Sequence, residues 1–429
     1  MTLVNLVQQS YLIADSVIVG RYVGVSGLAA VGGAQPVYYL VSSVFLGLLN
    51  GFTIRIATLT GREEDGTRQA VILALAAFVL IWSVLCIALI ALGADAMLTA
   101  IGIPEATAAG SIVYLHTLGI GLLPIFCQGA LTAVFRGMGR PRLIMPVLAG
   151  SSVLNIALAW LLVGACGLGV RGAALGTVGA SALSSFAGAA LAMHHYAIHR
   201  YRASWASCVT QMKGSLRLGY PMGIQFVFLA LGNFVLTSLV APFGAVALAA
   251  ISIAARLETV TSRVFLDLSG AVTVLVAQRR GAGEVTEIRR AVRLSLLCSI
   301  WATFAVMSIV IALHADIGAL FTRSTAVAAI LDRYIVITYP FFPLFTLMAV
   351  AHGFLNGLGR TTVPLLCTIV SYVVARVPSA ALLSRHWGID GVIWAVDIGW
   401  FVGATFTAWV VALQLRERRL YEWTKGAAA

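Results

Sequence analysis

The sequence predicts an all-α protein that crosses a membrane many times. Of its 429 residues, 60% are hydrophobic and only 10% are charged, whereas about 25% of the residues of a soluble protein are charged. Uncharged stretches such as 70–93 and 294–313 reach the roughly 20 residues with which an α-helix crosses the hydrocarbon core of a bilayer. These observations exclude a water-soluble enzyme and predict a polytopic membrane protein.

Apolar runs between turn residues and charges predict twelve transmembrane helices. Two of them, 26–60 and 246–278, are too long for one perpendicular span, so we expect them to tilt or to extend beyond the bilayer. The twelve predicted helices are 2–20, 26–60, 69–93, 107–135, 142–165, 172–197, 215–241, 246–278, 290–313, 326–355, 361–384 and 391–415.

The positions of the basic residues support this count and predict the orientation. With the C-terminus in the cytoplasm, the loops after even-numbered helices and the tail contain 19 Lys and Arg residues, and the opposite loops contain 5. Cytoplasmic loops carry such an excess, so we expect a multi-pass protein of the plasma membrane, the inner membrane of a bacterium. These loops account for much of the net charge of +12, and no nucleic-acid partner is expected.

The sequence also repeats itself at one interval, which predicts an internal duplication. Residues 23–34, VGVSGLAAVGGA, match residues 243–254, FGAVALAAISIA, at a shift of 220. Further pairs at this shift, or at one residue less, are Gly61 with Gly281, GMGR (137–140) with GLGR (357–360), and GVRG (169–172) with GIDG (388–391).

The repeat predicts two six-helix bundles, 1–197 and 214–415, joined by a cytoplasmic linker at 198–213 and followed by a basic cytoplasmic tail at 416–429. Because six is even, both bundles enter the membrane from the same side and are related by a pseudo-two-fold axis along the membrane normal. Two homologous bundles that face one another suggest a transporter that rocks about a central cleft.

Asp15 is the first candidate functional residue, since it lies within the apolar segment LVQQSYLIADSVIVG at 6–20. A charged Asp at bilayer depth costs at least roughly 2.5–3.5 kcal/mol, and such carboxylates are mostly ion or proton sites. Gln8, Tyr11 and Asp15 share one stripe of a helix, which we expect to face the protein interior. The alternatives are a structural residue that forms hydrogen bonds and one that pairs with Arg21 near the end of the helix.

Asn155 and Thr177 form a second polar constellation, on the fifth and sixth predicted helices. Each of them alone is most often a residue that hydrogen-bonds one helix to another. A functional interpretation therefore depends on whether the fold brings them next to Asp15.

The eighth predicted helix carries four charged residues, Arg256, Glu258, Arg263 and Asp267. Arg263 and Asp267 are four residues apart and can pair on one face, so a structural ion pair is the first interpretation. The rival interpretation is that these four residues, together with Arg55, line a water-filled substrate cavity. Arg376 and Asp397 are further charges inside predicted helices, and the sequence does not say which charges face a cavity.

No cofactor or catalytic constellation is expected. The six cysteines have no CxxC or paired spacing, and the seven histidines form no ligand pattern, so neither a metal site nor a disulfide framework is indicated. A membrane-embedded enzyme such as an acyltransferase stays an alternative, but it would need a His/Asp or metal constellation at one membrane face.

The sequence resembles the multidrug and toxic compound extrusion (MATE) family of transporters over nearly its whole length. The order and spacing of seven segments, more than any single motif, are typical of this family. These segments are QQSYLIADSVIVGRYVGVSGLAAVG, FRGMGRPR, VLNIALAWLLVGACGLGVRGAALGT, LGYPMGIQ, VALAAISIAARLE, VAQRRGAGE and LNGLGRTTVP.

This resemblance implies a V-shaped pair of six-helix bundles that exports organic, often cationic, molecules in exchange for H⁺ or Na⁺. In one prokaryotic branch, the coupling site of the first bundle combines an Asp, a Gln and a Tyr of helix one with an Asn of helix five and a Thr of helix six. By motif alignment these residues are Asp15, Gln8, Tyr11, Asn155 and Thr177 of this chain.

The chain departs from the family pattern at several positions. Where the branch often has a second acid one turn after the helix-five Asn, this chain has Ala159, which favours a proton over Na⁺ because Na⁺ needs several oxygen ligands. Another branch uses acids in helices seven and ten, whereas 215–241 has none and helix ten has only Asp332 at its rim. Asp267 and Arg55 are also unusual for the family and suggest a specialised substrate.

Taken together, the sequence predicts a secondary active antiporter that exports organic drugs or metabolites by rocker-switch alternating access. H⁺ is the expected coupling ion and Na⁺ the second choice. Small organic molecules and the lipid bilayer are the expected partners, and the protein is expected to be a monomer. A flippase of lipid-linked or natural-product precursors stays an alternative, since it needs a large cationic cavity, for which the candidates are Arg55, Arg256, Arg263 and Arg376.

Overall fold

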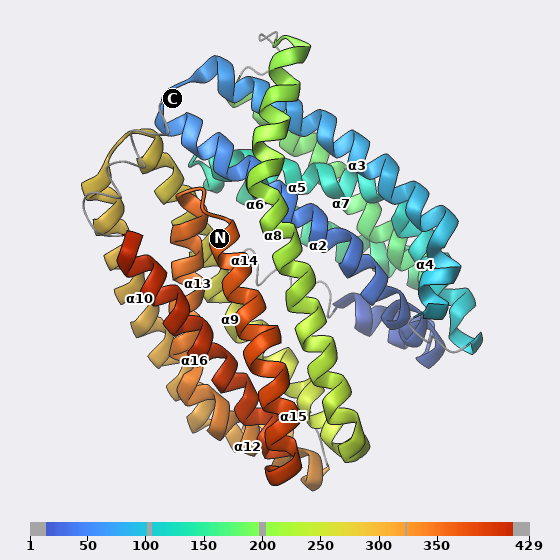
Figure 1. The fold of residues 1–429 in the computed structure, drawn as a ribbon. Coiled ribbons are helices and arrows are strands. Elements are labelled where there is room, and N and C mark those ends of the chain that lie inside the picture. The colour runs from blue at the N-terminus through green and yellow to red at the C-terminus, as the bar shows by residue number, and fades with distance from the viewer. Residues whose placement is uncertain (1–13, 101–104, 197–202, 322–323, 415–429) are drawn as a thin grey trace. The chain divides into compact units, whose positions relative to one another are not determined.

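The computed structural model describes four stretches of the chain, 14–100, 105–196, 203–321 and 324–414. Within them all regular structure is helical and no strand occurs, as the composition predicts. The chain divides into two compact units, Met1–Gly219 and Tyr220–Ala429, which are called unit 1 and unit 2 from here on (Figure 1). The boundary falls a few residues after the start of the second predicted bundle.

Unit 1 consists of long helices joined by short turns. Within it α6 packs against α7, and α2 packs against α3, α4 and α5. After a helical segment at 14–22, its elements are α2 (Val25–Gly61), α3 (Asp65–Ala100), α4 (Glu105–Ile120), α5 (Leu122–Gly137), α6 (Pro141–Ala159), the π-helical turn η1 (Trp160–Ala165) and α7 (Gly169–Tyr196).

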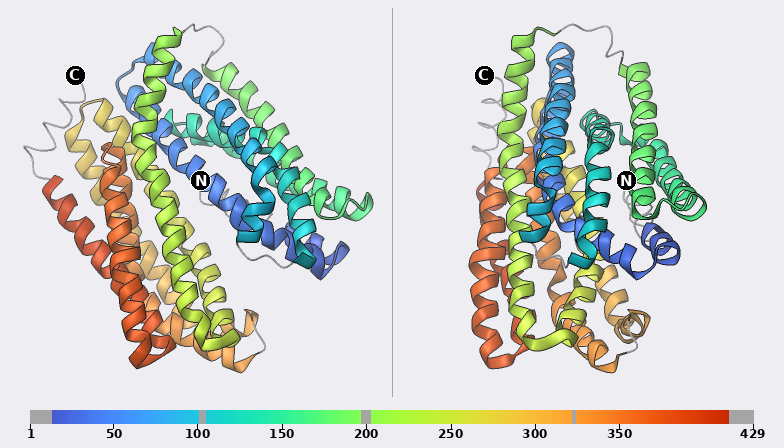
Figure 2. Two further views of the ribbon diagram at one scale, coloured as in Figure 1. Left: turned by 45° about the vertical axis from the view of Figure 1, so that its right-hand side comes forward. Right: turned by 90° about the vertical axis from the view of Figure 1, so that its right-hand side faces the viewer.

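Unit 2 begins within α8 (Trp205–Val240). Figure 2 shows its helices, coloured yellow-green to red, running side by side along much of their length. The elements after α8 are η3 (Ala241–Phe243), α9 (Gly244–Gly281), α10 (Val285–Ala312), α11 (His314–Phe321), α12 (Thr325–Thr338), η4 (Tyr339–Phe341), α13 (Phe342–Gly357), α14 (Thr362–Thr368), the π-helical turn η5 (Ile369–Ala375), α15 (Arg376–Trp387) and α16 (Ile389–Gln414).

Nine helical stretches in the described part of the chain are long and apolar enough to cross a membrane, and a tenth is added when the bent pair α4 and α5 is counted as one span. One of the nine, Trp205–Gly281, has 77 residues and covers two predicted spans, 215–241 and 246–278. The predicted span 2–20 lies mostly outside the described residues. The protein is therefore a multi-pass membrane protein, and the count of twelve stays a prediction.

Two of the predicted helices are interrupted. The segment predicted as 107–135 is α4 and α5, which meet at Gly121 with a bend of 53°. Pro124 contributes to the break, because it has no N–H for the helical bond to residue 120. The segment predicted as 326–355 is interrupted by η4, which contains Pro340 and lies 220 residues after the first bend.

The turns of the two units recur at the interval of the sequence repeat. Left-handed backbone conformations, in which glycine is favoured, occur in pairs separated by 220 residues, and a further pair, Gly169 and Gly388, is separated by 219. The pairs at 220 are Gly24 (φ 85°) and Gly244 (φ 88°), Glu63 (φ 60°) and Gly283 (φ 74°), and Gly139 (φ 71°) and Gly359 (φ 77°).

A close helix crossing is repeated as well. Gly137 on α5 contacts α2, and Gly357 on α13 contacts α9; a Cβ atom added at either glycine would lie only 2.7 Å from its nearest neighbour. Both crossings therefore require a residue without a side chain. The facing residues are Thr53 and Ile56 in unit 1 and Thr273 and Val276 in unit 2, again 220 residues apart.

The predicted linker at 198–213 is helical from Trp205 onward, where α8 begins. Two of its side chains, Cys208 and Met212, pack against the hydrophobic core of unit 1. This part of α8 therefore belongs structurally to unit 1, although the charge pattern alone predicts a connecting loop.

Candidate functional site

Asp15 lies in the first helical segment and faces α6. The side-chain amide of Asn155 has one orientation that gives both its nitrogen and its oxygen a partner, and that orientation is assigned on this ground. Its nitrogen then donates to the two carboxylate oxygens of Asp15 at 3.0 and 3.2 Å, and its oxygen accepts from the hydroxyl of Thr177 at 3.1 Å. The structure thus joins three of the predicted site residues in one hydrogen-bonded row.

Small residues bring α6 and α7 close enough for this row to form. A Cβ atom at Gly172 would lie 2.9 Å from the carbonyl oxygen of Leu162, and one at Gly176 would lie 3.0 Å from the backbone nitrogen of Ala159. The two glycines therefore let the backbones approach directly. Thr177 follows Gly176 and is thereby held beside α6.

The burial of the row fits a polar site inside the protein. Asn155 is 3% exposed, and Asp15 and Thr177 are partly buried. Among the described residues no ion pair joins Asp15 to Arg21, whose side chain is exposed. The alternative that Asp15 is held by a neighbouring guanidinium therefore finds no support.

The two other predicted members of this site, Gln8 and Tyr11, lie outside the described residues. Ala159, the position where a second acid was considered, is fully buried. It contributes no oxygen ligand beside Asn155.

A second hydrogen-bonded cluster continues from this row along α6 and α7. The side-chain nitrogen of Gln128 donates to the hydroxyls of Ser151 at 3.1 Å and Ser184 at 3.0 Å. A cavity of about 30 Å³ lies here, which is room for one or two water molecules. Its lining residues are Gln128, Ser151, Ser152, Asn155, Thr177, Ala180 and Ser181.

The charges of the eighth predicted helix, now α9, lie in different surroundings. Arg263 and Asp267 form an ion pair with Nε and Oδ1 3.6 Å apart, as their spacing predicts. Arg256 is exposed. Glu258 accepts a hydrogen bond from the hydroxyl of Tyr334 on α12 and lines a cavity within unit 2.

That cavity measures about 290 Å³ and is enclosed by residues of α8, α9, α12, α13, α15 and α16 and of the turn η5. Arg376 lines it, donating to the side-chain oxygen of Asn233 at 3.3 Å and lying 4.7 Å from the ring centroid of Tyr372. Asp397, near Arg376, is 2% exposed and has no hydrogen-bond partner among the described residues.

Sequence reasoning recognised Glu258, Arg376 and Asp397 as intramembrane charges but did not group them. Glu258 and Asp397 are more than 100 residues apart in the sequence. Nothing in the sequence marks Tyr334 or Asn233 as a contact of these charged residues. A carboxylate and a guanidinium in separate apolar helices are the signal that could have linked them, since each needs a counter-charge.

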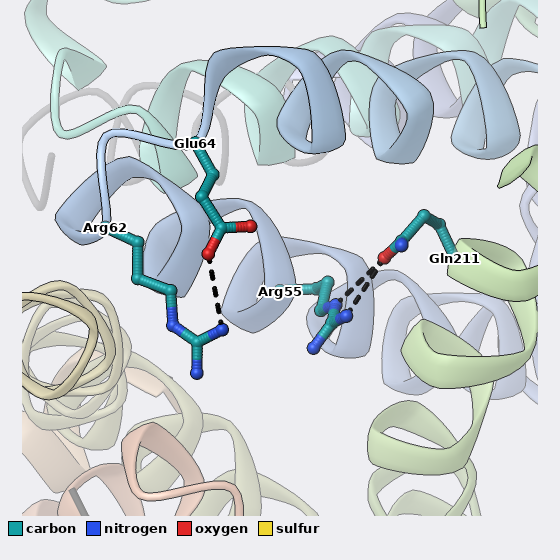
Figure 3. Close-up of polar contacts among 4 residues, drawn as sticks. All are labelled: Arg55, Arg62, Glu64 and Gln211. Atoms are coloured by element: carbon teal, nitrogen blue, oxygen red, sulfur yellow. Dashed lines mark hydrogen bonds and ion pairs between the residues drawn. The ribbon is translucent and has the colours of Figure 1, made fainter. Parts of the chain in front are cut away.

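Arg55, the fifth predicted cavity residue, lies in unit 1 and is partly buried. Its Nε and Nη2 atoms both donate to the side-chain oxygen of Gln211 on α8, at 3.1 and 3.0 Å (Figure 3). Arg62, also shown in Figure 3, contacts Glu64 at 3.5 Å near the surface. Arg55 therefore ties the first part of α8 to α2.

No metal site is present in the part of the chain that the structure describes, because no three His, Cys, Asp or Glu residues group together there. The centre in unit 1 instead has one carboxylate beside amide and hydroxyl groups, and the centre in unit 2 has two carboxylates near a guanidinium. Such arrangements bind protons and small polar molecules.

Comparison with known proteins identifies a family. The sequence model of the MatE family matches residues 1–161 and 221–382, two segments that begin 220 residues apart. A relative described as a probable multidrug resistance protein, NorM of Mesorhizobium japonicum, is 28% identical, covering 92% of this chain and 87% of its own. NorM of Deinococcus radiodurans, described in the same words, is also 28% identical, covering 97% and 92%.

Solved structures share the fold. The Vibrio cholerae MATE transporter VcmN, in a mutant form, superposes with a TM-score of 0.90 at 21% identity, covering 98% of this chain and 96% of its own. An outward-facing multidrug resistance MATE family transporter of the MOP superfamily gives a TM-score of 0.89 at 22% identity, covering 97% and 93%.

Proposed function

The chain belongs to the multidrug and toxic compound extrusion (MatE) family, and from this premise we propose that it is a secondary active antiporter that exports organic molecules in exchange for protons. The members of this family are transporters and not enzymes, so the acyltransferase alternative is set aside. Relatives that span almost the whole chain are named as probable multidrug resistance proteins, which supports small organic molecules as the cargo.

The observation that carries the proposal is the hydrogen-bonded row of Asp15, Asn155 and Thr177. A carboxyl group is the one member of this row that gains and loses a proton in the ordinary pH range. Burial disfavours its charged form, and hydrogen bonds from Asn155 favour it. Movement of the first helical segment relative to α6 would change that balance, which links protonation to conformation.

The chemistry of the row favours H⁺ over Na⁺. In the assigned orientation the nitrogen of Asn155 donates to Asp15, so the carboxylate already has a hydrogen-bond donor without a metal cation. Ala159 supplies no second carboxylate. A proton needs a single acceptor oxygen and is compatible with this arrangement.

Alternating access would follow from the duplicated scaffold. We propose twelve transmembrane helices in two bundles that are related by a pseudo-two-fold axis along the membrane normal and rock about it. The recurrence of turns and of one helix crossing at the repeat interval supports this arrangement. The remaining predictions of location and assembly, a cytoplasmic C-terminus in the bacterial inner membrane and a monomeric state, belong to the same proposal.

The test is uptake of ethidium into everted membrane vesicles. An imposed pH gradient should drive uptake by the wild-type protein with or without Na⁺, and Asp15→Asn should abolish it. Asn retains an oxygen that accepts from Asn155, so the variant should fold and insert normally.

Arg21→Gln is the matched control, because Arg21 follows Asp15 on the same helical segment and is exposed. It should transport like the wild type. Uptake by Asp15→Asn at the wild-type rate would reject the proposed site, and uptake that requires a Na⁺ gradient would reject the proposed ion.

A further inference from the structure

The cavity of unit 2 has the size and lining of a binding site for a small molecule. Its volume of about 290 Å³ is at the low end of the roughly 300–1,000 Å³ range of ligand pockets. Much of the wall is apolar and aromatic, with Phe342, Phe345 and Trp400 among the lining residues. Such a wall suits a ring or a short hydrocarbon chain.

Arg376 gives this cavity a cationic group with unused donors. Its side chain is 3% exposed and comes from the first residue of α15. A guanidinium has five N–H donors, and among the described residues Asn233 is the acceptor for one of them. The ring of Tyr372 covers one face of the guanidinium. A planar cation held in this way is suited to a carboxylate, which it can bind through two parallel hydrogen bonds.

Glu258 gives the same cavity an anionic group. The hydroxyl of Tyr334 donates to one of its oxygens, Oε1, and a carboxylate has about four acceptor positions. Capacity to accept further hydrogen bonds therefore remains. Three N–H donors of an ammonium group would match it.

Asp397 is not among the residues that line the cavity. It is 2% exposed and near enough to Arg376 for their charges to interact. Asp397 therefore acts as a positioning residue, whose charge interacts with the guanidinium although its side chain is not part of the cavity wall.

We propose that this cavity binds a small zwitterion, a molecule with one ammonium and one carboxylate group, such as an amino acid with an aromatic or aliphatic side chain. Glu258 binds the ammonium, Arg376 binds the carboxylate, and the aromatic wall binds the side chain. The proposal names a cargo class and in that respect rests on the proposed export function, but binding itself needs no ion gradient. Neither a purely cationic nor a purely anionic molecule would satisfy both charged side chains.

The experiment measures equilibrium binding by calorimetry to the full-length protein in lipid nanodiscs. Three probes share one aromatic ring and differ in charge: L-phenylalanine, 2-phenylethylamine and 3-phenylpropanoate. L-phenylalanine should bind at least about tenfold more tightly than either single-charge probe, the effect expected of one charge-assisted hydrogen bond. Because no gradient is applied, this result does not depend on whether transport is coupled to protons.

Two variants test which side chain binds the carboxylate of the ligand and which binds its ammonium group. Arg376→Gln should remove the preference of L-phenylalanine over the amine, and Glu258→Gln, which keeps an oxygen that can accept from Tyr334, should remove its preference over the acid. Arg385→Gln is the control, because Arg385 is an exposed residue of the same helix α15 and should leave all three affinities unchanged.

The wild-type comparison decides the proposal even if Arg376→Gln fails to fold. Equal binding of the amine and the amino acid would identify a cation site and overturn the proposal. Tightest binding of the acid, or binding of none of the three probes at millimolar concentration, would also overturn it.

Discussion

The polar centres of unit 1 and unit 2 are built differently on a repeated scaffold. In unit 1, one carboxylate accepts from a neutral amide, which in turn accepts from a hydroxyl, beside a cavity of about 30 Å³. In unit 2, two carboxylates lie near a guanidinium, beside a cavity of about 290 Å³. The first centre has room for water or an ion, and the second has room for an organic molecule.

At the repeat interval, the hydrogen-bonded row of unit 1 has no polar counterpart in unit 2. At a shift of 220, Asp15 and Asn155 correspond to Val235 and Ala375, and at a shift of 219 Thr177 corresponds to Val396. Turns and helix crossings recur because they are set by backbone geometry, which both units need. Charges in apolar helices are costly, so they are found only where each unit uses them.

The largest effect on transport is expected when residues of the hydrogen-bonded row in unit 1 are replaced by their counterparts in unit 2. Asn155→Ala copies Ala375 and removes the donor to Asp15, a hydrogen bond to a charged group worth about 1.5–3 kcal/mol. Proton-driven uptake in everted vesicles should fall at least about tenfold. Thr177→Val, which copies Val396, should have a smaller effect because Asp15 keeps its direct partner.

Gln128→Ala is the control for this comparison, since Gln128 bonds to Ser151 and Ser184 and makes no contact with Asp15 in the described structure. It should lower thermal stability without changing the proton dependence of uptake. A loss of coupling equal to that of Asn155→Ala would contradict a site centred on Asp15.

The second effect concerns the crossing that both units share. Gly137→Ala and Gly357→Ala should each destabilise the protein by about 1–3 kcal/mol through overpacking, measured by thermal unfolding in detergent. Gly357→Ala should cost more, because its Cβ would meet the backbone oxygen of Thr273, whereas that of Gly137 first meets the side chain of Ile56.

Gly150→Ala serves as the reference for these variants, because nothing lies within 4 Å of a Cβ atom there. It should be neutral or stabilise α6 by about 0.5–1 kcal/mol. Tolerance of alanine at 137 or 357 would mean that the crossing is looser than described.

A third effect tests a contact that unit 1 has and unit 2 lacks. Arg55 corresponds to Leu275 at the repeat interval. Gln211→Leu removes the acceptor of Arg55 and should destabilise the protein by about 1–1.5 kcal/mol, since the pair is partly exposed. Gln211→Glu should retain stability, because a carboxylate also accepts from Arg55. Both values come from thermal unfolding.

Arg62→Gln provides the comparison for that contact, because Arg62 and Glu64 form an ion pair near the surface. Its effect should be close to zero. A loss of stability equal to that of Gln211→Leu would show that any charged contact of α2 stabilises the protein equally, and not specifically the contact between α2 and α8.

The smallest effect on stability is expected at two equivalent turns, one in each unit. Glu63 has a left-handed φ of 60° where unit 2 has Gly283 with φ 74°. A residue with a side chain costs about 1–2 kcal/mol in this conformation. Glu63→Gly should therefore stabilise the protein by up to about 1 kcal/mol, and Gly283→Ala should destabilise it by a similar amount. Opposite signs in thermal unfolding are the expected result, and equal signs would contradict the equivalence.

Much of the fold could be predicted because it depends on local patterns. Apolar length and charge placement predict the long apolar helices that the described part of the chain forms, and the sequence repeat predicts two units. Two details were missed. At the bend, Gly121 approaches Val178 on α7 so closely that a side chain would not fit, and the helical part of the linker has side chains such as Met212 that pack against unit 1. Both are contacts between distant segments.

Of the two candidate sites, the sequence predicted the residues of the first but not the grouping of the second. Asp15, Asn155 and Thr177 could be named because they match a family pattern residue by residue, and the structure places them in hydrogen-bond contact. The cluster around Arg376 could not be assembled from sequence. Its members come from different helices, and no spacing relates Glu258 on α9 to Asp397 on α16.

Hydrophobic length, charge placement and turn glycines act over short distances along the chain, and they are therefore enough to identify a helical membrane protein and to predict a duplicated scaffold. Which of the intramembrane charges meet becomes visible only in the folded protein. That outcome depends on how helices rotate and cross, which is set by packing contacts between residues far apart in the sequence.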